Sequence, residues 1–318
     1  MKNKNLPLMQ IIGPVYNEEE TIKKFCDRLI QTLKKHETNY RWEVLFVLDK
    51  SSDNSYKILK EICKKNNKVK LLYLSSRFGH QMSLLAGIDN SNGDIIVMMD
   101  TDLQHPPELI SKFLIEYEKG NDIVAGVRFI SGENNFLKKI VSKYFYSIMR
   151  FLTNIDIKDG EADFRLISKR VANVFKNDIR EQNQFLRGLF SWVGFDKSYV
   201  LFEADKRYQG KSKYNWITMF SFASVGITSF SKKPLRFAVI LGLGFSAIGL
   251  LFSAYNFINY WFNNNVPPGW TTLTIIICIL GGIQLLFLGV IGEYIGQIFD
   301  QVKNRPLYLV KEKINFKK

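Results

Sequence analysis

The stretch Ile95-Ile96-Val97-Met98-Met99-Asp100-Thr101-Asp102-Leu103-Gln104-His105-Pro106-Pro107 decides how the rest of this chain is interpreted. Its apolar half follows Gly93 and predicts a short buried strand. Its two aspartates therefore emerge at a carboxyl strand end, where open α/β sheets bind ligands. Two carboxylates this close repel each other in an apolar site, and a divalent cation with ligand phosphates relieves that repulsion. Asp100, Asp102 and Gln104 are thus candidate ligands of Mg²⁺ or Mn²⁺, with a solvated acidic turn as the alternative.

The amino-terminal part of the chain repeats this strand pattern. Apolar runs at Met9 to Gly13, Trp42 to Leu48, Val69 to Leu74 and Ile123 to Val127 predict four further strands. Amphipathic stretches lie between them, and Glu18 to Lys35 has its apolar residues at helical spacing. Repeated strand and helix units predict an α/β fold with a doubly wound, mostly parallel sheet.

Polar loops follow the predicted strands and should line one crevice. They run over residues 14–18, 49–55, 75–81 and 100–104, and Arg128 ends the fifth strand. Their acidic, tyrosyl and basic side chains suit a nucleotide, which needs ring stacking, ribose hydrogen bonds and phosphate neutralisation. The chain has no Gly-x-Gly-x-x-Gly or Walker motif, so phosphates require a metal and cationic side chains. Asn17 and Asp53 have a simpler interpretation as helix caps.

Composition narrows the partners of the chain. A chain of 318 residues that is 46% hydrophobic fills a core, and its net charge of +14 indicates an acidic partner: nucleic acid, anionic lipid or a phosphorylated small molecule. Cys26, Cys63 and Cys278 have no metal-ligand spacing, which favours a reducing compartment. No apolar segment follows the polar start, so we expect no cleavable secretion signal and an amino-terminal part that stays in the cytoplasm.

The carboxyl-terminal third has the composition of a membrane anchor. No charged residue lies between Arg236 and Glu293, and the runs Phe237 to Phe262 and Thr271 to Gly292 each exceed the roughly 20 residues that a spanning helix needs. Basic residues precede the first run and follow the second, which predicts two transmembrane helices with both termini in the cytoplasm. Because positive charge clusters where the membrane begins, we expect anionic lipid and phosphate as partners, and no nucleic acid.

Two stretches outside these runs are rich in aromatic residues. Phe136 to Thr153 is basic and amphipathic, and Trp216 to Phe230 has almost no charge, so both predict helices at the membrane surface. An ordinary core-packed helix is the alternative for the first. We therefore expect a cytoplasmic domain over 1–213, a juxtamembrane amphipathic segment over 214–236, a transmembrane hairpin over 237–299 and a basic cytoplasmic tail over 300–318.

Six motifs, in order along the chain, carry a resemblance to a known family. They are Pro14 to Glu18, Asp49 to Ser55, Arg77 to Gln81, Asp100 to Glu108, Ala162 to Leu166 and Arg207 to Tyr214. Together they resemble family 2 glycosyltransferases. Their order is most similar to the polyprenyl-phosphate glycosyltransferases, the group that contains dolichol-phosphate mannose synthase and bacterial bactoprenol glucosyltransferases. The resemblance implies a nucleotide-diphospho-sugar transferase fold of GT-A type for 1–213. Leu48 and Lys50 depart from the family loop, which has an acid and a glycine there.

The resemblance also implies a role for each matching residue. The nucleoside would be held by Pro14, Tyr16, Glu18 and Asp49, and the metal and diphosphate by Asp100, Asp102 and Gln104. Arg128 would face the donor phosphates, and Arg207 and Lys213 would face donor or acceptor phosphates. Asp163 stands where the family has an acid near the reacting carbon, with Arg165 beside it as a second catalytic candidate. Asp163 either acts directly on the reacting groups, orients Arg165 or contacts the sugar.

The resulting expectation is a metal-dependent hexosyltransferase of the bacterial inner membrane. It would move a sugar from a nucleotide-sugar donor, a UDP-linked hexose, to a polyprenyl phosphate such as undecaprenyl phosphate, with inversion, for cell-envelope glycosylation. Four alternatives remain: transfer to another lipid acceptor, a processive polysaccharide synthase, a catalytically silent nucleotide-sugar-binding membrane protein, and a lipid-translocating hairpin. Gly188 after Arg187 disfavours the synthase, and the uncharged hairpin disfavours translocation. The identity of the sugar stays open, and so does a homo-oligomer.

Overall fold

The computed structural model of the chain describes residues 6–129, 151–153, 158–203, 226–263 and 269–316. Most of the two predicted membrane-surface helices, over 136–153 and 216–230, lies outside the described residues. Arg207 and Lys213 lie outside them as well.

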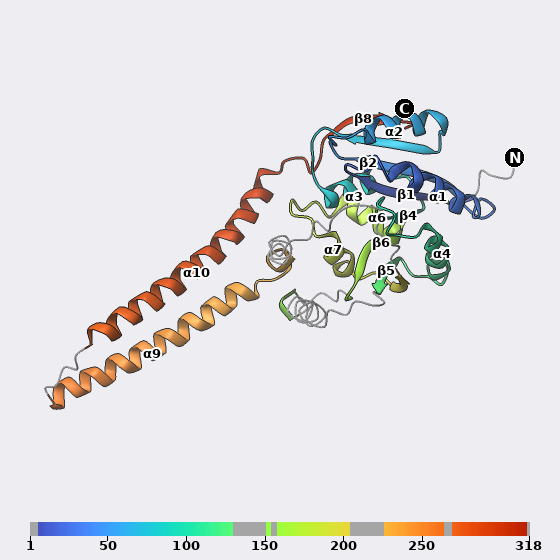
Figure 1. Ribbon diagram of the computed structural model, residues 1–318. Coiled ribbons are helices and arrows are strands. Elements are labelled where there is room, and N and C mark those ends of the chain that lie inside the picture. The colour runs from blue at the N-terminus through green and yellow to red at the C-terminus, as the bar shows by residue number, and fades with distance from the viewer. Residues whose placement is uncertain (1–5, 130–150, 154–157, 204–225, 264–268, 317–318) are drawn as a thin grey trace.

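One eight-stranded sheet organises the amino-terminal domain (Figure 1). Its strands are β1 (Leu8–Val15), β2 (Arg41–Leu48), β3 (Val69–Leu74), β4 (Ile95–Met98), β5 (Ile123–Phe129), β6 (Glu161–Ser168), β7 (Lys197–Glu203) and β8 (Val310–Ile314), in the order β7-β5-β6-β4-β1-β2-β3-β8. β1 is parallel to β2 and β4, β2 to β3, and β5 to β7. β6 is antiparallel to β4 and β5, and β8 is antiparallel to β3. The sheet is therefore mixed and mostly parallel, which confirms the predicted fold class.

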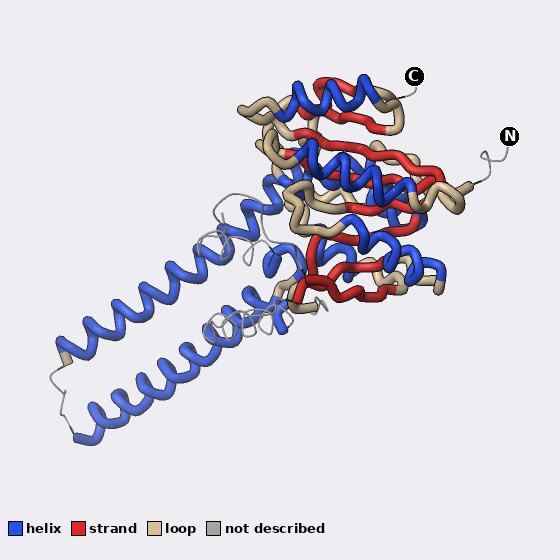
Figure 2. Tube along the Cα trace, turned by 45° about the vertical axis from the view of Figure 1, so that its right-hand side comes forward, coloured by secondary structure: helices blue, strands red, loops and turns tan. Residues whose placement is uncertain are grey.

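Helices cover both faces of this sheet (Figure 2). They are α1 (Ile22–Lys34), α2 (Ser55–Lys65), α3 (His80–Asp89), α4 (Ile110–Glu118), α6 (Lys169–Asn177) and α7 (Leu186–Trp192), with a 3-10 turn η1 (Pro107–Leu109) before α4. The buried side chains of α1, α2 and α4 form one core with β1 to β4, and those of α3, α6 and α7 form a second core on the other face. Successive strand residues alternate between these cores: Ile11 faces the first and Ile12 the second.

The five strands predicted from apolar runs are confirmed as β1 to β5. The helix predicted over 18–35 begins only at Ile22, and its N-cap is Thr21. Asn17 is therefore not a cap. It has a left-handed backbone, with φ 53°, and its Oδ1 accepts a hydrogen bond from the Ser52 backbone N–H at 2.9 Å. Asp53 stands one residue before Asn54, the N-cap position of α2, but its Oδ1 accepts from the Ser55 backbone N–H at 3.1 Å, at the start of that helix. Both side chains also help to tie the loop after β1 to the loop after β2, because Asp53 accepts from the Glu19 backbone N–H.

Two long apolar helices leave the domain side by side (Figure 1). α9 (Lys233–Asn263) and α10 (Trp270–Lys303) contain the two predicted spanning segments, and α10 continues eleven residues past the predicted end at Gly292. Large apolar side chains on both are exposed, including Leu243, Leu251 and Leu285. By length and composition both are candidate membrane spans, over Lys233–Asn256 and Ile279–Lys303.

The end of the chain returns to the sheet rather than forming the separate basic tail expected over 300–318. β8 pairs with the edge strand β3, with Leu72 opposite Lys313 and Leu71 opposite Ile314. The turn into β8 passes Asn304, which caps α10 with a left-handed backbone. Leu307 is buried in the second core, and the Tyr308 hydroxyl donates to Asp89 Oδ2 at 2.9 Å. The carboxyl end of the membrane hairpin is thereby fixed to β3 and α3.

Asn315 should stabilise this attachment. Its Nδ2 donates to the carbonyl oxygens of Cys63 and Val69, both at 2.7 Å, and its φ is 64°. Asn315→Gly keeps the left-handed backbone accessible but removes both hydrogen bonds. We expect a loss of about 1 to 3 kcal/mol in the free energy of unfolding, because two carbonyl oxygens lose their side-chain donor. Thermal unfolding of the full chain in detergent measures it, with Asn177→Gly, at the end of α6, as the control; equal melting temperatures for Asn315→Gly and wild type would contradict the attachment.

Candidate active site at the carboxyl ends of the strands

The pairing of β4 with β6 brings two aspartates together. Met98 lies opposite Arg165 in this antiparallel register, and each further step moves forward on β4 and backward on β6. Asp100 and Asp163 therefore meet just beyond the last paired residues. The carboxyl end of a strand is where this class of sheet binds ligands. The structure thus joins two residues that are 63 positions apart in the sequence.

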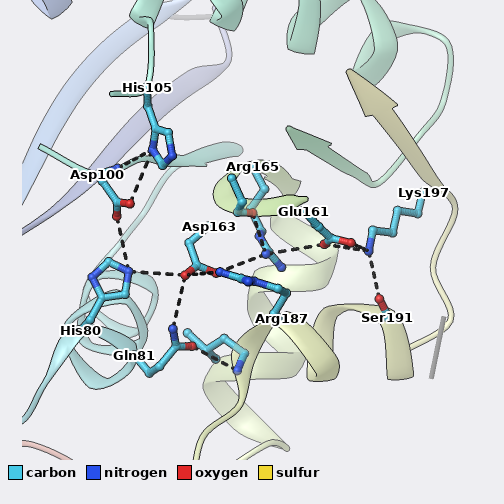
Figure 3. Close-up of polar contacts among 12 residues, drawn as sticks. His80, Gln81, Asp100, His105, Glu161, Asp163, Arg165, Arg187, Ser191 and Lys197 are labelled. Atoms are coloured by element: carbon cyan, nitrogen blue, oxygen red, sulfur yellow. Dashed lines mark hydrogen bonds and ion pairs between the residues drawn. The ribbon is translucent and has the colours of Figure 1, made fainter. Parts of the chain in front are cut away.

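His80 connects these two carboxylates (Figure 3). Its Nε2 lies 3.4 Å from Asp100 Oδ1 and 3.6 Å from Asp163 Oδ2. His80 is the first residue of α3 and follows Gly79, whose φ of 94° turns the chain into the helix. Burial alone would lower the pKa of His80, but Asp100 and Asp163 outweigh it and raise that pKa to about 9. In this ligand-free arrangement, the imidazolium compensates two negative charges.

Asp163 is held by donors on three elements (Figure 3). Arg187 on α7 donates to its Oδ2 at 3.0 Å, Arg165 on β6 to its Oδ1 at 3.4 Å, and Gln81 on α3 to its Oδ2 at 3.4 Å. Burial would raise the pKa of Asp163, yet Arg187, His80 and Arg165 hold it well below its ordinary value. Asp163 is therefore ionised at neutral pH and is a poor proton acceptor.

Arg165 lies beneath the site rather than in it. Its side chain is 1% exposed, its Nη2 is 3.6 Å from Glu161 Oε1, and its guanidinium stacks over the Phe190 ring at 4.5 Å. Lys197 donates to both oxygens of the fully buried Glu161, at 2.9 and 3.0 Å. This buried network of Arg165, Glu161 and Lys197 holds Asp163 from the interior of the domain. The catalytic role predicted for Arg165 stays a prediction, and its geometry suits holding Asp163 in place.

The turn after β4 carries the predicted metal ligands. The Asp100 backbone N–H donates to His105 Nδ1 at 3.0 Å, and Asp102 Oδ1 accepts from the Gln104 backbone N–H at 3.1 Å. Between the last two lies Leu103, whose φ of 66° is costly for a residue with a branched side chain. Such strain persists only where the surrounding structure imposes it. It brings Gln104 Oε1 within 3.3 Å of Arg128 Nη1, so the turn and the end of β5 form one polar surface.

One atom in this turn supports a cation site. Asp100 Oδ1 is buried and accepts no hydrogen bond, although His80 lies 3.4 Å away. A buried carboxylate oxygen without a donor is costly, and a cation would satisfy it. The donor set of two carboxylates and one amide oxygen suits Mg²⁺ or Mn²⁺. Within the described ranges, no three His, Cys, Asp or Glu side chains are grouped so that they could hold a metal ion. The ligand set Asp100, Asp102 and Gln104 stays a prediction that the orphaned oxygen favours.

The predicted nucleoside residues lie along β1 and β2. Tyr16 is half-buried under Arg77, whose guanidinium carbon is 4.2 Å from the ring centre. The Glu18 backbone N–H donates to Ser55 Oγ at 2.9 Å, and the carbonyl oxygen of the buried Pro14 accepts from Thr101 Oγ1 at 3.0 Å. The loop after β1 is thereby bound to those after β2 and β4. These residues share one end of the sheet with Asp100, and their donor-binding roles stay predictions.

Asp49 differs from what a surface ligand would show. It is 2% exposed, and its two oxygens accept from the backbone N–H groups of Phe78 and Gly79 at 3.0 and 2.8 Å. Its carboxylate therefore fixes the turn that presents His80. Lys50 beside it has no positive φ, so the loop does not require the glycine that the family has there. The departure at Lys50 thus leaves the backbone of the loop unstrained.

Three site residues were not singled out from the sequence. His80 could be interpreted as part of a plain Gly-His turn, Arg77 was noted only within its motif, and Arg187 only as the residue before Gly188. Arg187 lies outside the six motifs, so nothing in the sequence singled it out. Its partner Asp163 could not be found by spacing, because the two belong to different elements.

Comparisons with known proteins agree on a single family. The model of Glycosyl transferase family 2 matches residues 10–175, and that of the GtrB C-terminal hairpin matches residues 233–298. The "Uncharacterized glycosyltransferase YkcC" of Bacillus subtilis is 40% identical over 302 residues, covering 95% of this chain and 93% of that protein. The "Bactoprenol glucosyl transferase" of Shigella phage SfII is 35% identical over 306 residues, covering 96% of this chain and 97% of that protein. A crystal structure of mannosyl-3-phosphoglycerate synthase from Rubrobacter xylanophilus covers 69% of this chain and 71% of that one, at 12% identity and a TM-score of 0.46. That structural likeness is too weak to carry an argument.

Proposed function

This chain belongs to glycosyl transferase family 2, and on that premise we propose that it transfers a sugar from a nucleotide sugar to a polyprenyl phosphate. The proposed donor is a UDP-linked hexose, and the proposed reaction is a single displacement with inversion. Relatives that align over nearly the whole chain are named bactoprenol glucosyl transferases, and the hairpin family matches as well. The observation that carries the proposal is the convergence of Asp100, His80, Asp163 and Arg187 at the carboxyl ends of the strands.

The donor side of the proposed site stabilises the leaving diphosphate. Negative charge grows on this diphosphate during transfer, so hydrogen-bond donors and cations placed beside it lower the barrier. Arg128, bound to Gln104 in the turn after β4, is the described cation that we assign to it. A divalent cation held by Asp100, Asp102 and Gln104 would neutralise part of the same charge. Tyr16 and Glu18 lie at the nucleoside end of the crevice in this arrangement.

Asp163 acts in this proposal by position rather than by accepting a proton. A lipid phosphate has a second pKa of about 6 and is largely dianionic at neutral pH, so the nucleophile needs no general base. The lowered pKa of Asp163 agrees with this, since a weak base accepts protons poorly. Its ionised carboxylate keeps Arg187 and His80 beside the reacting groups. A covalent glycosyl intermediate is not required, and inversion is the expected outcome.

The location follows from the same proposal. A phosphate anchored in lipid headgroups stays close to the bilayer, so the crevice must lie near the membrane surface. We place residues 1–213 and both termini on the cytoplasmic side of the bacterial inner membrane, with α9 and α10 spanning it. Clusters of Lys and Arg at the two helix ends that adjoin the domain support this orientation.

A panel of donors tests the proposal. Purified full chain is incubated with undecaprenyl phosphate, Mn²⁺ and radiolabelled UDP-glucose, UDP-galactose, UDP-N-acetylglucosamine or GDP-mannose. We expect one UDP-hexose to give a labelled lipid product whose anomeric configuration, determined by NMR, is opposite to that of the donor. Binding of UDP without lipid product from any donor would instead favour a silent nucleotide-sugar-binding protein.

The two predicted phosphate-binding cations outside the described residues give a second test. We expect Arg207→Ala and Lys213→Ala each to reduce kcat/KM by about 10-fold to 100-fold, because a charge-assisted hydrogen bond to phosphate is lost. Lys23→Ala is the matched control, since Lys23 lies on the exposed face of α1. Steady-state rates over a range of undecaprenyl phosphate concentrations measure the effect. Equal losses in all three variants would mean that bulk charge, and not a site, is responsible.

A further inference from the structure

Both legs of the membrane hairpin contact one short segment of the amino-terminal domain. This coupling segment, residues 180–188, runs from the end of α6 into the first turn of α7. At the carboxyl end of α10, Gln301 Oε1 accepts from the Gln182 backbone N–H at 2.9 Å. The Gln182 side chain in turn donates to the carbonyl oxygen of Arg305 at 2.6 Å. Gln182 is thus bound to α10 by its backbone and to the residues just after α10 by its side chain.

The other leg contacts the same segment through an aromatic pair. Phe230, shortly before α9, meets Phe185 edge to face with ring centres 6.2 Å apart. A Cβ at Gly188 would lie 2.9 Å from Phe230 and 2.6 Å from Phe185, so only glycine allows both rings to approach the first turn of α7. The residues that lead into α9 are bound to α10 as well, because the Tyr294 hydroxyl donates to the Ser231 carbonyl oxygen at 2.6 Å.

The carboxyl-terminal end of the coupling segment contacts Asp163 and its neighbour Gln81. The Leu186 backbone N–H donates to Gln81 Oε1 at 3.2 Å, and Arg187 donates to Asp163 Oδ2 at 3.0 Å. Gln81 itself donates to Asp163. Hydrogen bonds therefore join the end of α10 to Gln182, the chain itself runs from Gln182 to Arg187, and hydrogen bonds join Leu186 and Arg187 to Gln81 and Asp163. α7 has only seven residues, and so short a helix has little stability of its own.

We infer that Gln182 and Gln301 are positioning residues for transfer. The Gln301 side chain holds the Gln182 backbone N–H, and the Gln182 side chain holds the Arg305 carbonyl oxygen; together these contacts fix the coupling segment and so place Arg187 against Asp163. This inference rests on the proposed function, because it concerns the same site. It adds that the site is complete only when the hairpin is docked. An acceptor held in the membrane must meet groups that are set relative to that membrane, and small misplacements of such groups reduce rates strongly. The hairpin is then part of the catalytic arrangement as well as an anchor.

Variants of the full chain, reconstituted in lipid nanodiscs with undecaprenyl phosphate, test this role. We expect Gln182→Ala and Gln301→Ala to lower kcat about tenfold or more, since Arg187 is no longer held in register. The KM for the nucleotide sugar should change less than about twofold, because the nucleoside end lies on the loops after β1 and β2. Gln31→Ala is the matched control on the exposed face of α1. Joining Gln301→Ala to Arg187→Lys should reduce kcat little further, since both act through one contact. Unchanged kcat in both glutamine variants would overturn the inference.

Hydrogen exchange separates this inference from the proposed function. Exchange of the amides of Leu186 to Trp192 is measured in the same nanodiscs without substrate. We expect it to become several times faster in Gln301→Ala than in wild type or Gln31→Ala, because local opening is easier when a docking contact is lost. Protection unchanged in Gln301→Ala would refute the coupling even if transfer occurs. Faster exchange together with no transfer by wild type from any donor would sustain the coupling and refute the proposed function.

Discussion

Asp102→Asn is expected to abolish sugar transfer while leaving the fold intact. Asp102 follows β4 in a turn, and its Oδ1 accepts from the Gln104 backbone N–H, a bond that an asparagine oxygen also accepts. The substitution removes one negative charge from the proposed cation site without removing volume. We expect kcat to fall by about 10³-fold or more, the scale at which a preorganised charge-stabilising group contributes.

Two measurements separate loss of the cation from loss of structure. Binding of Mn²⁺ to the full chain, followed by electron paramagnetic resonance, should weaken in Asp102→Asn but not in Asp27→Asn, an exposed control on α1. Melting temperatures of all three proteins should agree within about a degree, since surface changes are nearly neutral. Full activity of Asp102→Asn, or of wild type in excess chelator, would remove the metal from the proposed mechanism.

The sequence predicted the parts of the fold whose residues repeat a simple period. β1 to β5 appear as apolar runs, and the two long helices appear as uncharged stretches. β6 was not predicted, because Glu161, Asp163 and Arg165 interrupt its apolar residues. In the structure these charged side chains are buried against one another. β8 was not predicted, because the stretch Val310-Lys311-Glu312-Lys313-Ile314 is short and charged and follows a predicted membrane helix. Lysine is common on edge strands of sheets. Lys311 and Lys313 therefore suit β8, which is an edge strand of this sheet.

The candidate site was predictable to the extent that its residues follow strands directly. Asp100 and Asp102 belong to that class, and Arg128 is the last but one residue of β5. His80 lies on α3 and Arg187 on α7, two helices that pack in the second core. No spacing in the sequence gives the distance from either residue to Asp163. The resemblance assigned Asp49 to the nucleoside, and the structure adds that its buried carboxylate accepts from the backbone N–H groups of Phe78 and Gly79. Tertiary contacts between elements decide these three positions.

Asp163→Asn is expected to lower both the stability of the fold and the rate of transfer. It leaves Arg187, Arg165 and His80 without the carboxylate that compensates them, and unpaired buried charge is costly. We expect kcat to fall by about 10² to 10³, because Arg187 loses the partner that orients it. The free energy of unfolding should fall by about 3 kcal/mol, the scale for breaking one side of a buried ion pair. Asp178→Asn, exposed at the end of α6, is the control.

The pH dependence distinguishes the positioning role of Asp163 from proton transfer. Because its folded-state pKa is lowered, the stabilisation from its charge is present above its unfolded-state pKa of about 3.9 and is lost as the pH falls through the lower folded value. The stability difference between wild type and Asp163→Asn should therefore shrink in acid. It should also shrink as the pH rises from about 6.5 through about 9, because the His80 imidazolium that pairs with Asp163 then loses its proton. A general base would add an acidic limb to the kcat profile near neutral pH. If such a limb is present in wild type and absent in the residual activity of Asp163→Asn, Asp163 accepts a proton, and its lowered pKa must rise when substrates bind.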